Sequence, residues 1–359
     1  HPWQNPALQQ TFSTSAVPIL RYPAGTIGNY WDWRRGWIDP DIPDEDFVQF
    51  WLIPVRDAAQ RNPLVDLQPP MALPGRSILM MANLLTHDFP HTLSALHRAD
   101  LWGIRVPRIE LGNELYIDSD PLATRLYPTA SDYARVANAW AAALKAEYPT
   151  AQIAVPVAHV ISEVVGAPAY ARLTGWNAAL LPLLSSQIDA LALHLYRGTS
   201  VSPEARTVQL WGTPTEQEAQ YAALSTPAGV AGLLAQPAAV YREALELGGL
   251  LTVPRAIWIT EWNLVDYSGP TRHTWAHGLY VANAIDVFLS DPRVANITLH
   301  NIGDTLFGAF FIPPLDAYFS GLRVSGIDPH TLIDRITPYA PTAAGRVLSL
   351  FAKASSGAD

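Results

Sequence analysis

The chain has 359 residues, of which 49% are hydrophobic and 15% are charged, and it contains no cysteine. This composition is typical of a globular protein with a sizeable core, and the lack of cysteine excludes disulfides, thiolate metal sites and cysteine nucleophiles. The net charge of −9 argues against a nucleic-acid partner, because phosphate binding requires a basic face. No apolar stretch approaches the roughly 18 residues that a membrane span needs, so we expect no membrane partner.

Seven apolar runs rich in β-branched residues recur at roughly even spacing. We expect each to form a buried strand, at residues 19–23, 77–84, 108–115, 152–159, 188–196, 256–262 and 297–302. Helix-like stretches lie between or after these runs, at residues 90–103, 131–149, 168–187, 237–249, 271–292 and 337–356. Ser131 is the expected N-cap of the second helix. Strands that alternate with helices indicate βαβ units and a parallel sheet buried on both faces.

Seven or eight such units favour an α/β fold of the (β/α)8 TIM-barrel type over a doubly wound sheet. The glycines of "RYPAGTIGN" lack the G-x-G-x-x-G spacing that a dinucleotide-binding sheet would require. Strand 1 is not evident: it either hides in residues 1–15 or lies upstream, in which case residues 19–23 form strand 2. We expect one catalytic barrel domain over residues 1–359, without an accessory β-sandwich. A long insert, residues 197–255, follows strand 6 and holds Trp211 and Tyr221.

Polar side chains stand at the carboxyl ends of the expected strands, which in a parallel barrel face the mouth of the active site. They are Arg21, Asn83, Asn113, Glu114, His159, His194, Tyr196, Glu261, His300 and Asn301. Two carboxylates on facing strands suit cleavage of a glycosidic bond, because one protonates the leaving oxygen while the other attacks the anomeric carbon. A separation of about 5–5.5 Å would mean retention and about 6.5–9.5 Å inversion, a distance that sequence does not give.

The "GNE" that closes residues 108–115 and the "TEW" that closes residues 256–262 resemble the retaining glycoside hydrolases of clan A, the four/seven superfamily. The segment "LRYPAGTIGNYWDWRRG" is similar to the "RYPGG…W" segment of arabinofuranosidase-like families such as 51 and 39. The resemblance implies that Glu114 is the acid/base and Glu261 the nucleophile. It also implies that Asn113 contacts the sugar hydroxyl next to the anomeric centre, that Tyr196 holds the nucleophile, and that Arg21 lies beneath the nucleophile.

Three features depart from the pattern of these families. The last strand, "LHNIGD", lacks the Trp that many clan members place there, strand 1 is not evident, and no accessory β-sandwich is evident in these residues. The exact family therefore stays open.

Further candidates for substrate binding are the aromatic segment with Trp31, Asp32 and Trp33, and the Trp262 that follows the second glutamate. Trp offers a flat apolar face with a polar handle, which suits a sugar ring, but the same residues also serve as loop packing. Arg21 has a second interpretation as the ion-pair partner of a core carboxylate. His194 and His300 are alternatively hydrogen-bonded residues of the barrel.

The segment "HDFPH" places His87 and His91 four residues apart, a spacing that on a helix suits a metal ion. Pro90 argues against a regular helical turn there, so we expect a loop near the sugar site. The sequence predicts no metal and no other cofactor.

These observations favour a retaining glycoside hydrolase with a carbohydrate substrate. Two alternatives remain: a metal-dependent barrel isomerase or hydrolase with Glu114, Glu261, His194 and His300 as ligands, and an inactive carbohydrate-binding barrel. A secreted or periplasmic location is expected from this function alone. The sugar, the linkage, endo or exo action and the oligomeric state stay open.

Overall fold

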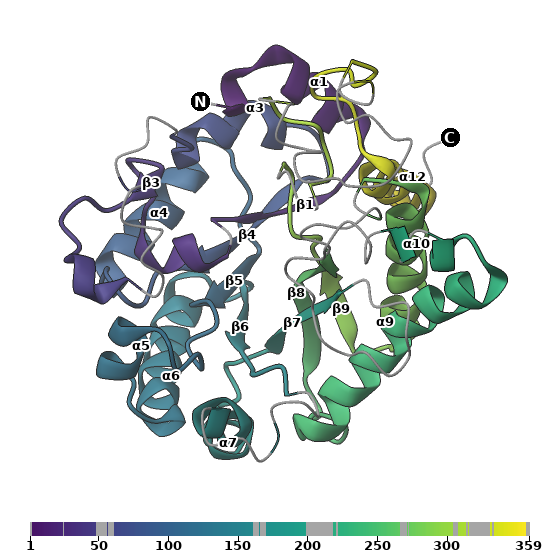
Figure 1. Cartoon of the computed structure of the whole chain (residues 1–359). Coiled ribbons are helices and arrows are strands. Elements are labelled where there is room, and N and C mark those ends of the chain that lie inside the picture. The colour runs from purple at the N-terminus through teal and green to yellow at the C-terminus, as the bar shows by residue number, and fades with distance from the viewer. Residues whose placement is uncertain are drawn as a thin grey trace. The chain divides into compact units, whose positions relative to one another are not determined.

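A computed structural model of the chain shows how the expected elements are arranged (Figure 1). It describes residues 2–23, 25–47, 56, 61–160, 165, 170–198, 218–219, 222–265, 271, 273–303, 308–313, 315, 331 and 334–356. The chain divides into two compact units. Unit 1 comprises His1–Gln9, Pro18–Leu193 and Glu243–Trp258, and unit 2 comprises Gln10–Val17, His194–Arg242 and Ile259–Asp359. The single catalytic domain stays a prediction.

The main sheet has seven strands in the order β1-β4-β5-β6-β7-β8-β9. Their bounds are β1 Ile19–Tyr22, β4 Ser77–Ala82, β5 Arg108–Leu111, β6 Gln152–Pro156, β7 Ala190–Gly198, β8 Ala256–Val265 and β9 Val294–Ile297. The four pairs from β1 to β7 are parallel, with Ile19 opposite Ser77 and Ala154 opposite Ala190 at their starts. Six strands overlap their predicted runs over most of their length, and the parallel α/β architecture is confirmed. The seventh prediction, residues 297–302, is wrong in its bounds, because β9 ends at Ile297 and residues 298–302 are not part of a strand. No eighth strand joins this sheet among the described residues, so the closed eight-stranded barrel stays a prediction.

The strands are apolar because they are buried. All six residues of β4 are buried, and the core of unit 1 gathers Leu79, Ala154, Ala190, Ala192 and Trp258 from four strands. A parallel strand that is covered on both faces has a continuous run of apolar residues rather than alternating apolar and polar residues. This is why these strands could be predicted from the sequence.

The α-helices are α1 Pro6–Thr14, α3 Gln68–Met71, α4 Phe89–Leu101, α5 Pro121–Leu126, α6 Ala130–Glu147, α7 Ala171–Leu180, α9 Pro227–Leu247, α10 Trp275–Leu289 and α12 Ala343–Ser356. Short 3₁₀ helices are η1 Pro2–Gln4, η2 Thr26–Tyr30, η3 Asp44–Asp46, η4 Leu64–Leu67 and η6 Leu181–Leu183. In unit 1, α4, α5 and α6 flank the sheet on the side of β4 to β6 (Figure 1). None of the described helices is long and apolar enough to cross a membrane.

The N-cap of α6 is Thr129, so the prediction of Ser131 is wrong. The Thr129 hydroxyl accepts a hydrogen bond from the backbone N–H of Asp132, and the Asp132 carboxylate accepts one in return from the backbone N–H of Thr129. This reciprocal capping box needs an acceptor side chain three residues after the cap. Ser131 has Ala134 at that position, which cannot return the bond.

The aromatic segment after β1 forms a short antiparallel hairpin of β2 (Trp31–Asp32) and β3 (Trp37–Ile38). Its turn closes where the Gly36 N–H donates to the Asp32 carbonyl over 2.7 Å. Gly36 has a φ of 68°, and a Cβ there would lie 1.9 Å from the backbone nitrogen of Pro63. Only glycine fits this turn, which fixes the place of Asp32 in unit 1.

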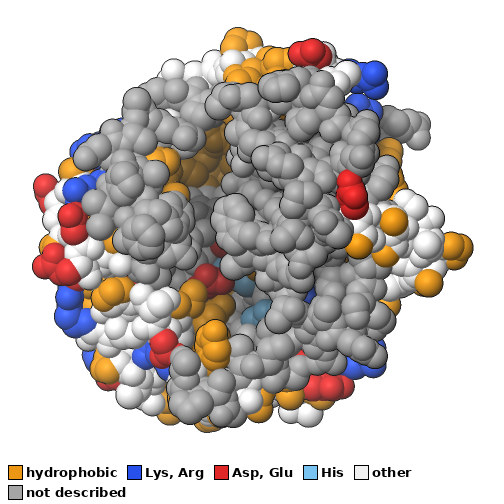
Figure 2. Space-filling model, in the orientation of Figure 1, with side chains coloured by type: hydrophobic (Ala, Val, Ile, Leu, Met, Phe, Trp, Pro, Cys, Tyr) orange, Lys and Arg blue, Asp and Glu red, His pale blue; other side chains and the backbone are white. Residues whose placement is uncertain are grey.

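The long insert after β7 is described only in part. Trp211 and Tyr221 lie outside the described residues. The helix predicted over residues 237–249 is observed as α9, which begins earlier, at Pro227, and ends at Leu247, directly before Gly248 and Gly249. On the face shown in Figure 2, the described Lys and Arg side chains lie in small separate groups interspersed with Asp and Glu.

Candidate active site

The "GNE" motif forms a tight turn directly after β5. Gly112 has a φ of 91°, and a Cβ there would meet Leu115 Cδ1 at 2.7 Å. Glu114 also has a left-handed backbone, with a φ of 47°. A non-glycine residue in this region costs on the order of 1–2 kcal/mol, so surrounding contacts must hold the turn. The turn leaves Asn113 buried and Glu114 half-buried.

A buried ion pair lies beside this turn. The Arg21 guanidinium of β1 donates to both Glu110 oxygens, over 2.7 Å and 3.0 Å, and to Asn113 Oδ1 over 2.8 Å. Glu110 lies within β5 and is 0% exposed. Such a bidentate pair fixes both partners, and a buried charge needs one. Arg21 therefore has the ion-pair role that the sequence left open; its predicted place beneath the nucleophile stays a prediction.

Asn29 holds the backbone of Asn113 from the other direction. Its Nδ2 donates to the Asn113 carbonyl over 2.8 Å, and the Asn113 N–H donates to Asn29 Oδ1 over 3.1 Å. Both side chains are buried. Sequence reasoning missed Asn29 and Glu110. The available signals were a carboxylate inside an apolar strand and an amide within the arabinofuranosidase-like segment.

Tyr116 lies beside the Glu114 carboxylate. The buried Tyr116 donates its hydroxyl to Glu114 Oε1 over 3.5 Å, the outer limit of a hydrogen bond. Arg172 of α7 holds the backbone that follows, since it donates to the carbonyls of Leu115 and Pro128 over 2.8 Å each. The turn is fixed while its carboxyl group stays half-buried.

The second glutamate, Glu261 on β8 in unit 2, has polar side chains around its carboxylate. The Tyr196 hydroxyl donates to Glu261 Oε2 over 2.6 Å. Nδ1 of His194 and Nδ1 of His300 each lie 3.8 Å from the same oxygen. His194 and Tyr196 are two residues apart on β7 and so point to one face, and His194 Nε2 lies 3.2 Å from Thr260 Oγ1. Glu261 is 5% exposed, so its charge depends on these partners.

A buried chain of polar groups positions His300. The His300 N–H donates to the Trp262 carbonyl over 3.3 Å, and Asn263 Nδ2 donates to the His300 carbonyl over 2.5 Å. His277 of α10 lies behind Asn263, with Nε2 2.7 Å from its Oδ1. The His273 N–H donates to His277 Nδ1, which places the His277 proton on Nε2. Burial lowers the pKa of His277 to about 3, so the ring is neutral at pH 7.

Asn83, a predicted substrate contact, is buried and bonded to the protein. Its Oδ1 accepts from the N–H groups of Leu85 and Thr86 over 3.0 Å each, and its Nδ2 donates to the Trp31 carbonyl over 3.2 Å. The amide therefore ties the end of β4 to the hairpin. His159 lies past β6 and Asn301 past β9, both half-buried. Substrate contacts of these three residues stay predictions.

The three candidate tryptophans are largely buried. The indole N–H of Trp31 donates to the Tyr22 hydroxyl over 3.0 Å, and that of Trp33 to the His91 carbonyl over 3.2 Å. Trp262 is 0% exposed and packs edge-to-face on Phe288, with ring centroids 5.4 Å apart. A small pocket of about 20 Å³ in unit 1 is lined by Tyr22, Trp31, Trp33, Met81, Asn83 and His91, among others. Its volume is about that of a single water molecule.

Comparisons with known proteins reveal similarity of fold. No protein-family model matches the sequence, and no curated protein matches it. The family 51 α-L-arabinofuranosidase AbfB from Bifidobacterium longum superposes with a TM-score of 0.55 at 13% identity, over 96% of this chain and 66% of that chain. A family 51 arabinofuranosidase from Xanthomonas axonopodis pv. citri gives 0.51 at 14% identity, over 84% and 61%. A family 44 xyloglucanase from Paenibacillus polymyxa gives 0.52 at 10% identity, over 86% and 72%.

The chain spans between 57% and 66% of the length of the arabinofuranosidase structures that it resembles. At such low identity the likeness concerns the fold alone. The chain thus has the barrel-like α/β fold that these glycoside hydrolases share.

Proposed function

We propose that this protein is a glycoside hydrolase that cleaves its substrate by retaining double displacement, with Glu261 as nucleophile and Glu114 as acid/base. The observation that carries the proposal is the environment of Glu261: a buried carboxylate with a tyrosine hydroxyl at 2.6 Å and two imidazoles at 3.8 Å. The fold shared with glycoside hydrolases supports it.

The contacts of Glu261 suit a nucleophile. A short hydrogen bond from Tyr196 stabilises the negative charge and directs the carboxylate. In the first step the Glu261 carboxylate attacks the anomeric carbon, the glycosidic C–O bond breaks, and a glycosyl ester forms on Glu261. His194 and His300 limit the rotation of the carboxylate during this attack.

The contacts of Glu114 suit an acid/base. Its carboxyl group gives a proton to the departing glycosidic oxygen in the first step. In the second step it takes a proton from water, the water oxygen attacks the anomeric carbon, and the ester bond to Glu261 breaks. Asn113, Asn29 and Arg21 fix the turn, so the carboxyl group keeps its place while its protonation changes twice. Asn113 contacts the sugar hydroxyl next to the anomeric centre.

The substrate class is a plant or microbial polysaccharide, or an oligosaccharide derived from one. L-arabinofuranosides, β-xylosides, β-glucans and galactans are the sugars to test. We place the enzyme outside the cytoplasm, because such polymers lie outside the cell.

Hydrolysis of a panel of aryl glycosides and polysaccharides tests the proposal. Wild type, Glu261→Gln and Glu114→Ala are compared, and proton NMR follows the anomeric configuration of the first product. We expect retention, a loss on the order of 10⁴-fold or more for Glu261→Gln, and a loss of about 10²–10⁴-fold for Glu114→Ala. Azide should restore turnover of Glu114→Ala on aryl glycosides with good leaving groups, because the ester no longer needs a general base.

One control variant and two tests of the alternatives complete the experiment. Glu147→Gln alters an exposed carboxylate that contacts His97 and should keep full activity. A catalytic metal would make the wild type lose turnover after chelation, and an inactive sugar-binding barrel would bind a sugar without turnover. An inverted first product would contradict the retaining mechanism.

A further inference from the structure

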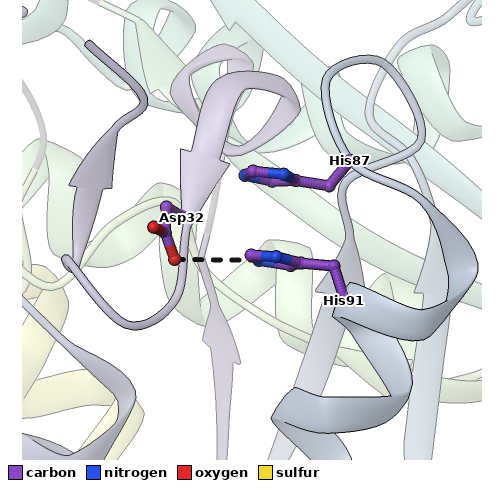
Figure 3. Close-up of side chains that lie close together, drawn as sticks. All are labelled: Asp32, His87 and His91. Carbon is purple, nitrogen blue, oxygen red and sulfur yellow. Dashed lines mark ion pairs between the residues drawn. The ribbon is translucent and has the colours of Figure 1, made fainter. Parts of the chain in front are cut away.

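Hairpin β2–β3 and the start of α4 bring one carboxylate and two imidazoles together in unit 1 (Figure 3). Asp32 lies on β2, His87 precedes α4, and His91 lies in the first turn of α4. Each offers one ligand atom, and these atoms lie within 4.8 Å of one another. Among the side chains that the structure describes, these three form the His/Asp/Glu group with this property. We propose that Asp32, His87 and His91 bind a transition-metal dication of the zinc class.

The local structure differs from the loop expected at "HDFPH". Asp88 caps α4 by accepting a hydrogen bond from the His91 N–H over 2.9 Å, and Pro90 lies in the first turn. The prediction of a loop is wrong for His91, because the N–H that proline lacks has no helical partner in a first turn. His91 is thereby fixed on a helix. Asp32 is fixed by the glycine turn of the hairpin, where its Oδ1 accepts from the Arg34 N–H over 2.8 Å.

The donor atoms suit zinc. Imidazole nitrogen and carboxylate oxygen bind Zn²⁺ at about 2.0–2.2 Å, and His91 Nε2 lies 3.7 Å from Asp32 Oδ1, near the span that one shared ion requires. The His87 and His91 side chains are 14% and 12% exposed, and their Nε2 atoms have no hydrogen-bond partner among the described residues. Asp39 Oδ2 lies 3.9 Å from His87 Nε2 and adds a second carboxylate beside the cluster.

The charges around this cluster also favour a cation. Two carboxylates, Asp32 and Asp39, balance the two charges of the ion, while Arg34 contributes one opposing charge.

Metal binding requires two local movements. The rings of His87 and His91 lie face to face, with centroids 3.7 Å apart and planes 3° from parallel (Figure 3). An imidazole lone pair lies in the plane of its ring, so a shared ion requires one ring to tilt out of this stack. Arg34 Nη1 lies 3.0 Å from His91 Nδ1. Because a guanidinium can only donate, Nδ1 of His91 accepts, and the proton of the neutral His91 ring lies on Nε2.

Arg34 is exposed and can leave. On binding, Arg34 releases Nδ1, the proton moves from Nε2 to Nδ1, and Nε2 takes the metal. Arg34 therefore competes with the ion for His91. Removal of Arg34 should strengthen metal binding, whereas removal of a ligand should weaken it. A bound ion would join the hairpin to α4. Trp33 would report it, because its ring centroid lies 6.0 Å from that of His91.

The test is calorimetric titration of the full chain, freed of metal by a chelator, with Zn²⁺ at pH 7.5, alongside Trp fluorescence and the visible spectrum with Co²⁺. We expect one Zn²⁺ per chain, a Kd on the order of micromolar, and a higher Tm with zinc. His91→Ala and Asp32→Asn should each weaken binding about 10–100-fold, as expected when a ligand is lost. Arg34→Met should strengthen binding several-fold.

His97→Ala is the matched control, since His97 lies on the same helix but is exposed and contacts Glu147. It should leave zinc binding unchanged. No zinc binding by the wild type, equal binding by Asp32→Asn, or weaker binding by Arg34→Met would each overturn the proposal. If His91→Ala does not fold, the near-isosteric Asp32→Asn and the exposed Arg34→Met still decide. None of these readouts depends on glycoside hydrolysis, so the result stands apart from the proposed function.

Discussion

One glutamate, Glu114, follows β5 and the other, Glu261, lies within β8 rather than at the strand end that the sequence predicted, and the two have different surroundings. At β5, Arg21 and Asn29 bond to Asn113, the residue before Glu114, while the Glu114 carboxylate accepts a long 3.5 Å bond from Tyr116. At β8 the contacts reach the carboxylate itself: a 2.6 Å bond from a hydroxyl and two imidazoles at 3.8 Å from one oxygen of Glu261.

The two surroundings suit two different catalytic roles. A group that gives and takes protons needs a fixed backbone and a carboxyl group open to substrate and water. A group that stays ionised and attacks along one line needs its oxygens held. The comparison predicts that substitutions near β5 act mainly on stability and on the turn, whereas those near β8 act mainly on turnover.

The largest effect on stability should come from Glu110→Gln. The change leaves the Arg21 guanidinium buried without its full counter-charge, which typically costs about 3–5 kcal/mol. Urea unfolding measures the free energy, with the exposed Glu147→Gln as control, expected within about 0.5 kcal/mol of wild type. A Glu110→Gln protein as stable as wild type would mean that the ion pair does not hold β1 and β5.

The pair of variants Tyr196→Phe and Tyr116→Phe tests the difference between the two glutamates most directly. Each substitution removes one tyrosine hydroxyl that donates to a glutamate: Tyr196 to Glu261 over 2.6 Å, and Tyr116 to Glu114 over 3.5 Å. Tyr196→Phe should lower kcat about 10²–10³-fold, as loss of one well-placed donor does. Tyr116→Phe should lower it less than about tenfold, because a bond at that length is weak. Equal losses in steady-state kinetics would refute the difference drawn between the two sites.

Asn29→Ala should destabilise the protein by about 1–3 kcal/mol, the cost of leaving buried backbone groups of Asn113 unbonded, and should lower kcat. Asn138→Ala is its matched control: Asn138 also makes one donor and one acceptor bond to backbone, at Leu183 and Ser185. The control should lose stability with kcat unchanged. Thermal melts and kinetics on both variants check this, and unchanged kcat for Asn29→Ala would separate the turn from catalysis.

A pH dependence of stability should come from His277. Its folded pKa, about 3, lies below the ordinary value near 6.5, so the unfolded chain binds the extra proton between these values. Stability should therefore fall as the pH drops from about 6.5 toward 3, by up to about 1.4 kcal/mol per pH unit from this group. His277→Gln should flatten the slope in urea unfolding, while the exposed His97→Gln should not. Equal slopes in wild type and His277→Gln would refute the assignment.

The sequence predicted the strands because burial on both faces leaves a continuous apolar run. It missed features that depend on partners far along the chain. Glu110 pairs with Arg21 across 89 residues, and the bonds of Asn29 to Asn113 span 84. The hairpin β2–β3 has two residues per strand, too few for a periodic pattern. At His91, the proline taken as evidence for a loop was a first-turn proline.

The central claim is that Glu261 becomes covalently bound to sugar during turnover. Its most direct test is intact and peptide mass spectrometry of the wild type after reaction with a 2-deoxy-2-fluoro glycoside of the sugar found in the substrate panel. We expect a mass increase of one glycosyl residue, located on Glu261 and absent in Glu261→Gln. An adduct on another residue, or inverting hydrolysis without an adduct, would contradict it.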